Sequence, residues 1–64
     1  MNLMEAVRQA VEQGKRIYRT KEPECHMIPD PINKEVMLIL VGRIWKIWVP
    51  SIEDILADDY KVIG

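Results

Sequence analysis

The residues of this chain that could take part in catalysis each have a simpler interpretation. Cys25 and His26 are the only cysteine and histidine, so no second thiol or imidazole completes a metal site or a nucleophile–base pair, and neighbours in an extended segment point in opposite directions. We expect them to form a pair in a surface loop. Asp58 and Asp59 are adjacent rather than facing each other, and Asp commonly ends a helix. Ser51 has no base at a suitable spacing. We therefore predict no catalytic residue, no metal site and no cofactor.

Basic and aromatic residues indicate binding chemistry instead. Arginine and lysine can neutralise phosphates, and an aromatic ring can stack on a base. Five basic residues lie on the predicted first strand, the loop after it and the predicted hairpin, namely Arg16, Arg19, Lys21, Arg43 and Lys46. Trp48 follows the last of them closely. This pattern fits a small ligand that carries both phosphates and a base. It equally fits a solvated charged surface, and Trp48 equally fits a core or interface anchor.

The segment 48–63 contains strong signals for local structure. Pro50 ends a strand because it lacks an N–H group. Ser51 is a good N-cap, and Asp54 three residues later forms the acidic version of a capping box. The following short helix places Ile52, Ile55 and Leu56 on one face, and Tyr60 to Ile63 then alternates like a strand.

The first part of the chain predicts a helix followed by a short strand. Asn2 and Glu5 form a polar capping box, and Gly14 is suited to a left-handed helix end. The apolar face of that helix consists of Leu3, Ala6, Val7, Ala10 and Val11. A strand from Lys15 to Arg19 follows, with Ile17 towards the core. Three prolines, two glutamates and an aspartate make Thr20 to Pro31 a predicted loop.

Two further strands, Lys34 to Val41 and Arg43 to Val49, are predicted to form a hairpin around Gly42. Both faces of this hairpin are apolar, whereas a strand that is buried on one side alternates apolar and polar residues. One helix covers one face of the sheet, and small monomers rarely expose a large apolar patch. We therefore expect a second copy of the chain to cover the other face.

Length and composition limit the function. The 64 residues form one domain, 1–64, and the predicted fold class is α+β, a small antiparallel β-sheet with an N-terminal helix packed on it and a short helix before the last strand. The net charge of −1 argues against a nucleic-acid binder. The N-terminus does not resemble a signal peptide and no apolar run is long enough to cross a membrane, so we expect no membrane partner. A lone cysteine fits a reducing cytoplasm.

The order of residues in the last third resembles a known family. Its C-terminal pattern is Trp-x-Pro-Ser-x-x-Asp-Ile/Leu-x-Ala-x-Asp-Trp/Tyr-x-Val, and the small phage and prophage proteins that carry it form the Thoeris anti-defence 2-like family. The matching residues here are Trp48, Pro50, Ser51, Asp54, Ile55, Ala57, Asp59, Tyr60 and Val62. The opening is similar too, with Met1-Asn2 and Glu5-Ala6, then Gly14-Lys15 and Tyr18-Arg19.

This resemblance implies a non-enzymatic protein that sequesters a messenger. Members of the family bind a cyclic ADP-ribose isomer made by bacterial Toll/interleukin-receptor immune proteins, and some hold cyclic dinucleotides. They form dimers and dimers of dimers, with pockets where subunits meet, in the cytoplasm of the bacterial host. The candidate ligand-binding residues here are Arg19, Lys46, Trp48, Pro50, Ser51 and Asp54. For Ser51 and Asp54, helix capping is the competing interpretation.

The chain departs from the family pattern at one position that bears on the ligand. Members often carry Trp three residues after the arginine of the first strand, where this chain has Glu22. Two hypotheses remain open. The protein sequesters a cyclic nucleotide, not necessarily the same one, or it is a small interaction module that inhibits a host protein through its apolar sheet face.

Overall fold

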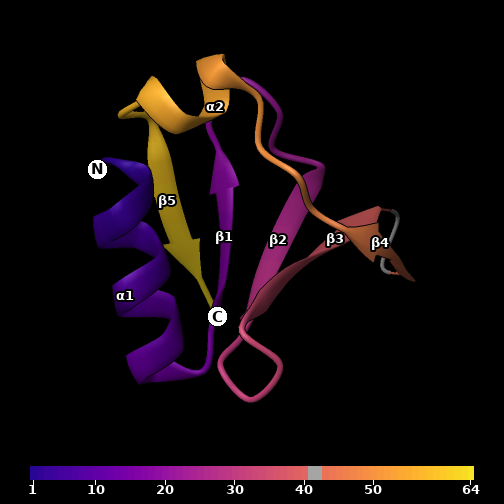
Figure 1. Cartoon of the computed structure of the whole chain (residues 1–64). Helices are drawn as coiled ribbons and strands as arrows, with labels where there is room; N and C mark the ends of the chain where they lie inside the picture. Colours follow the sequence, from indigo (N-terminus) through magenta and orange to yellow (C-terminus); the bar gives the residue numbers. More distant parts are fainter. Residues whose placement is uncertain (41–42) are drawn as a thin grey trace.

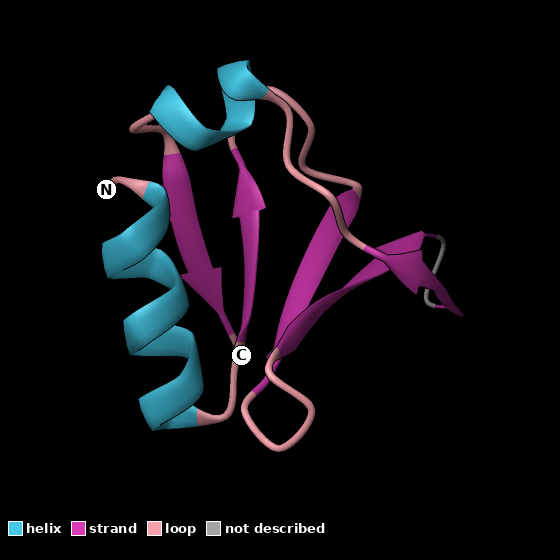
Figure 2. Cartoon of the chain, viewed as in Figure 1, coloured by secondary structure: helices cyan, strands magenta, loops and turns pink. Residues whose placement is uncertain are grey.

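The computed structural model describes residues 1–40 and 43–64, which form two helices and a five-stranded antiparallel sheet (Figures 1 and 2). The strand order is β4-β3-β2-β1-β5. The elements are α1 (Leu3–Gln13), β1 (Arg16–Arg19), β2 (Cys25–Asp30), β3 (Glu35–Leu40), β4 (Arg43–Ile47), α2 (Ile52–Leu56) and β5 (Tyr60–Ile63). This confirms the predicted α+β class, with an N-terminal helix and a short helix before the last strand. The predicted turn at Gly42 lies outside the described residues.

Local capping signals set the ends of α1. The Asn2 side chain accepts a hydrogen bond from the Glu5 N–H at 2.9 Å, and the Glu5 carboxylate accepts one from the Asn2 N–H at 3.3 Å. Gly14 ends the helix at φ 64°, a left-handed conformation that glycine adopts without steric cost. Both predicted ends of the helix are confirmed.

The core lies between α1 and the β5–β1–β2 part of the sheet, as Figure 1 shows. Ala6 and Ala10 are fully buried and bring the helix close to the strands. Ile17, Met27 and Tyr60 fill the sheet side of this core. Since α1 packs on β1, β2 and β5, the β3–β4 hairpin extends beyond the helix.

The prediction of a loop from Thr20 to Pro31 was wrong for its second half. Cys25–Asp30 is β2, which pairs with β1 on one side and along its whole length with β3 on the other. Pro29 lies outside the two-residue stretch that pairs with β1, so its missing N–H removes no bond from that ladder. Cys25 and His26 are therefore strand residues and not a surface-loop pair. Neither the prolines nor the acidic residues, which suggested a loop, prevent pairing at these positions.

Several large apolar side chains are exposed to solvent in the single chain. They belong to β4, to the segment that follows β4, and to α2. The residues are Ile44, Ile47, Val49, Ile52, Ile55 and Leu56. Val49 is 81 % exposed and Leu56 77 % exposed, values more usual for polar residues. The apolar surface that the sequence argument required is present, and a second copy that covers it stays a prediction. Within the described residues, no helix has the length and apolarity needed to cross a membrane.

Candidate functional site

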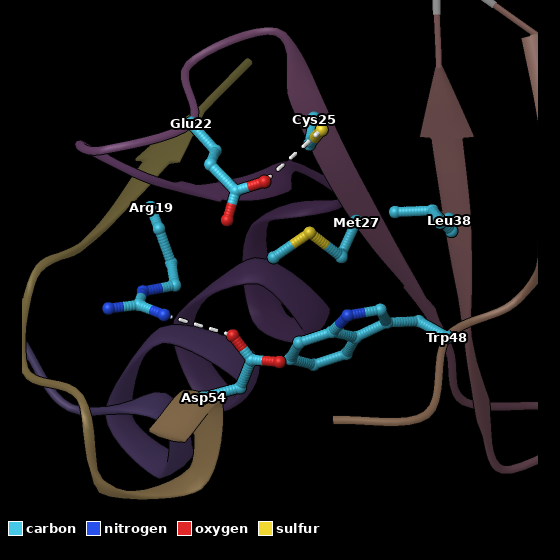
Figure 3. A pocket seen from close by; sticks show the side chains of 7 residues that line it. All are labelled: Arg19, Glu22, Cys25, Met27, Leu38, Trp48 and Asp54. Carbon is cyan, nitrogen blue, oxygen red and sulfur yellow. Dashed lines mark hydrogen bonds and ion pairs between the residues drawn. The ribbon is translucent and has the colours of Figure 1, made fainter. Parts of the chain in front are cut away.

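A cavity of about 230 Å³ opens between the sheet and the segment that returns from β4 to α2 (Figure 3). Its lining comes from six parts of the chain and consists of Arg19, Glu22, Cys25, Met27, Leu38, Trp48 and Asp54. The Trp48 N–H donates a hydrogen bond to the Val36 carbonyl at 2.7 Å, which holds the returning segment against β3. The Trp48 indole thereby forms one wall of the cavity, beside the apolar side chains of Met27 and Leu38.

Arg19 joins three elements at the edge of this cavity. Its Nε donates to Asp59 Oδ1 at 2.9 Å and its Nη1 donates to Asp54 Oδ1 at 3.0 Å. Glu53 Oε1 lies 3.7 Å from the same Nη1, and the guanidinium carbon lies 6.0 Å from the centre of the Tyr60 ring. Arg19 is only 8 % exposed. The arginine therefore fixes α2 and the start of β5 to the end of β1.

The carboxylates around Arg19 are held in their charged form. The hydrogen bond from Arg19 lowers the pKa of Asp59. Burial alone would raise the pKa of Asp54, but hydrogen bonds from Ser51 and Arg19 outweigh it and lower the pKa. The pKa of Glu53 is lowered chiefly by its hydrogen bond with Lys21, whose Nζ lies 2.5 Å from Glu53 Oε1. The positive charges of Arg19 and Lys21 are thus largely balanced within the protein.

Cys25 and His26 lie on different sides of β2. Cys25 lines the cavity, whereas the His26 ring lies against Tyr18 with the ring centres 5.5 Å apart and has its Nε2 3.0 Å from the Pro23 carbonyl. Burial, together with the carboxylates of Glu22 and Glu24, raises the pKa of the Cys25 thiol. The thiol is therefore protonated at neutral pH and is a poor nucleophile. No group of metal-ligating side chains is present among the described residues.

The cavity brings together three of the six predicted ligand-binding residues, namely Arg19, Trp48 and Asp54. The other three, Lys46, Pro50 and Ser51, are not part of its lining. Ser51 caps α2: its hydroxyl accepts from the Asp54 N–H at 3.2 Å, and its own N–H donates to Asp54 Oδ2 at 3.0 Å. The capping role predicted for both residues is confirmed. Any direct contact of the six residues with a ligand stays a prediction.

Four lining residues were not among the predicted site residues. They are Glu22, Cys25, Met27 and Leu38. The alternation of Cys25 and Met27 on one face of an extended segment was a usable signal, but the strand itself was missed. For Leu38, the sequence predicts a strand position and nothing more. In the sequence, Glu22 differs from the family pattern but carries no other signal of a site residue.

Comparison with family models identifies the chain. The model of the Thoeris anti-defense 2-like domain matches residues 1–63, nearly the whole sequence. Searches of curated proteins and of solved structures gave no significant match. The chain belongs to the Thoeris anti-defense 2-like domain family.

Proposed function

We propose that this protein is a phage anti-defence factor that binds a cyclic nucleotide immune messenger and holds it intact. Membership of an anti-defense family supports a role against a bacterial immune system, inside the host cell where that system acts. The candidate messengers are a cyclic ADP-ribose isomer and cyclic dinucleotides. Binding lowers the free messenger concentration below what the downstream effector needs, and no bond is broken.

One observation carries this proposal: the lining of the cavity combines an aromatic side chain, apolar side chains and hydrogen-bonding groups. Trp48 offers an aromatic surface to a base, and Met27 and Leu38 offer apolar contact beside it. Arg19 and Asp54 add polar groups to the lining. This combination suits a nucleotide, whose base is flat and apolar on its faces and polar at its edges.

The size of the cavity also favours assembly. Pockets for small molecules usually enclose about 300–1,000 Å³, and this one encloses about 230 Å³. It would hold one base of a cyclic nucleotide and leave the rest outside. In this proposal a second copy, docked through the exposed apolar side chains of β4 and α2, completes the pocket.

Calorimetric titration of the wild-type protein with a cyclic ADP-ribose isomer and with cyclic dinucleotides tests the proposal. We expect tight binding of at least one of them, and release of the unchanged ligand when the complex is heated. Trp48→Ala should weaken this binding, while Arg8→Ala, which replaces an exposed cation of α1 outside the cavity lining, should not. Sedimentation of each variant separates a loss of assembly from a loss of binding.

Conversion of the ligand into products would show an enzyme. Absence of binding to every cyclic nucleotide tested would favour the second function, a module that inhibits a host protein. The exposed Ile44, Ile47 and Val49 on and after β4 favour that alternative, because they would offer an apolar docking surface without any small ligand.

A further inference from the structure

Glu22 differs from the other charged residues of the cavity lining in what it contacts. Arg19 and Asp54 pair with each other at 3.0 Å, and the second Asp54 oxygen accepts from Ser51. Within residues 1–40 and 43–64, no cation lies within ion-pair distance of the Glu22 carboxylate, which receives a long contact of 3.9 Å from the Cys25 thiol. Its two oxygens can therefore accept hydrogen bonds from a ligand.

The geometry of the cavity relates Glu22 to Trp48. Figure 3 shows the Glu22 side chain reaching into the cavity from the segment between β1 and β2, with the Trp48 indole on the other side and Met27 between them. In this proposal a flat base that contacts the indole turns its edge towards the Glu22 carboxylate. Of the seven lining residues, Glu22 is the one that is exposed to solvent.

The chemistry of a carboxylate selects among bases. An ionised carboxylate only accepts hydrogen bonds, so two adjacent donors on the base satisfy it best. Guanine offers such a pair in its N1–H and its N2 amino group. Adenine and cytosine each place an acceptor nitrogen beside the amino group, and uracil places a carbonyl on each side of its single N–H.

We propose that Glu22 reads the N1–H and N2 amino edge of guanine, so that this protein binds guanine-bearing cyclic nucleotides in preference to adenine-bearing ones. This inference rests on the proposed function and specifies the ligand of the same cavity. A bidentate contact to a base discriminates by about 5- to 150-fold against the wrong base. A cyclic ADP-ribose isomer, which carries adenine, should accordingly bind more weakly than a guanine cyclic dinucleotide.

The test uses cyclic di-GMP and cyclic di-AMP, which share one backbone and differ in their bases. Their affinities are measured by calorimetry for the wild type, for Glu22→Gln and for Glu24→Gln. Glutamine keeps the shape of glutamate but presents one acceptor and one donor, which match the edge of adenine. Glu24 is an exposed neighbour outside the cavity lining and serves as the matched control.

We expect the wild type to prefer cyclic di-GMP by about 5- to 150-fold, Glu22→Gln to lose or reverse that preference, and Glu24→Gln to keep it. Equal affinities in the wild type, a preference for cyclic di-AMP, or an unchanged ratio in Glu22→Gln would overturn the guanine assignment and leave the proposed function standing. No binding of either dinucleotide or of a cyclic ADP-ribose isomer would overturn both.

Discussion

Replacement of Tyr60 by phenylalanine tests how α2 is held against the sheet. The Tyr60 ring is 1 % exposed in the core, and its hydroxyl donates to the Asp54 carbonyl in α2 at 2.5 Å. Phenylalanine keeps the ring packing and removes this one hydrogen bond. A hydrogen bond of this kind contributes about 0.5–1.5 kcal/mol net to the free energy of unfolding. In a domain of this size, about 1 kcal/mol corresponds to a fall in Tm of about 4–8 °C.

Tyr18 provides a matched control for this substitution. Its ring lies against His26, and its hydroxyl makes no hydrogen bond with any residue that the structure describes. Thermal unfolding followed by circular dichroism, at one protein concentration, should show a lower Tm for Tyr60→Phe than for Tyr18→Phe. If Tyr60→Phe unfolds at the wild-type temperature, or Tyr18→Phe falls further, the Tyr60 hydroxyl does not anchor α2.

Alkaline titration gives an independent measure of how strongly burial affects the Tyr60 hydroxyl. Burial, followed by the nearby Asp54 carboxylate, raises the pKa of Tyr60 to about 12 from an ordinary value of 10.0. The folded state therefore holds this proton more tightly than the unfolded state. The resulting stability is fully present below about pH 10 and is lost as the pH rises towards 12. Tyr60→Phe should remove this part of the alkaline pH dependence, and Tyr18→Phe should keep it.

Three further predictions concern the cap, the carboxylates and assembly. Ser51→Ala should lower the free energy of unfolding by about 0.5–2 kcal/mol in thermal or urea melts, and an unchanged stability together with lost ligand binding would instead place Ser51 in the ligand site. The folded-state pKa values of Asp54 and Asp59 are lowered, so their contribution to stability is present above about pH 4 and lost as the pH falls below it. Asp59→Asn should make melting temperatures less sensitive to acid over that range, and an acid dependence identical to that of the wild type would contradict the role given to the Arg19 contact. Sedimentation at micromolar concentration should show at least a dimer, and a stable monomer at high concentration would contradict the assembly argument.

The contacts of Arg19 within the protein limit what the variant Arg19→Ala can show about ligand binding. Arg19→Ala removes contacts to Asp54, Asp59 and Glu53 and so is expected to disturb the position of α2 as well as any ligand contact. A loss of binding in that variant would not by itself identify a phosphate contact. Trp48 and Glu22 are therefore better probes of the cavity.

Much of the local structure followed from the sequence because its causes lie within a few residues. The capping boxes of Asn2 with Glu5 and Ser51 with Asp54 each join positions three apart, and both form as predicted. The left-handed end at Gly14 likewise depends on the conformation of one residue. The apolar pattern of the β3–β4 hairpin correctly indicated more apolar surface than one helix covers.

Tertiary structure alone decided which residues meet. β2 exists because Cys25–Asp30 pairs with β3 along its whole length, and the partner strand outweighs the loop-like composition. Arg19 meets Asp54 and Asp59, which lie 35 and 40 positions further along the chain. The cavity likewise needs Trp48 to be carried back across the sheet before α2. Periodicity and capping signals describe single elements, whereas these contacts depend on strand order, which no local pattern in this chain specifies.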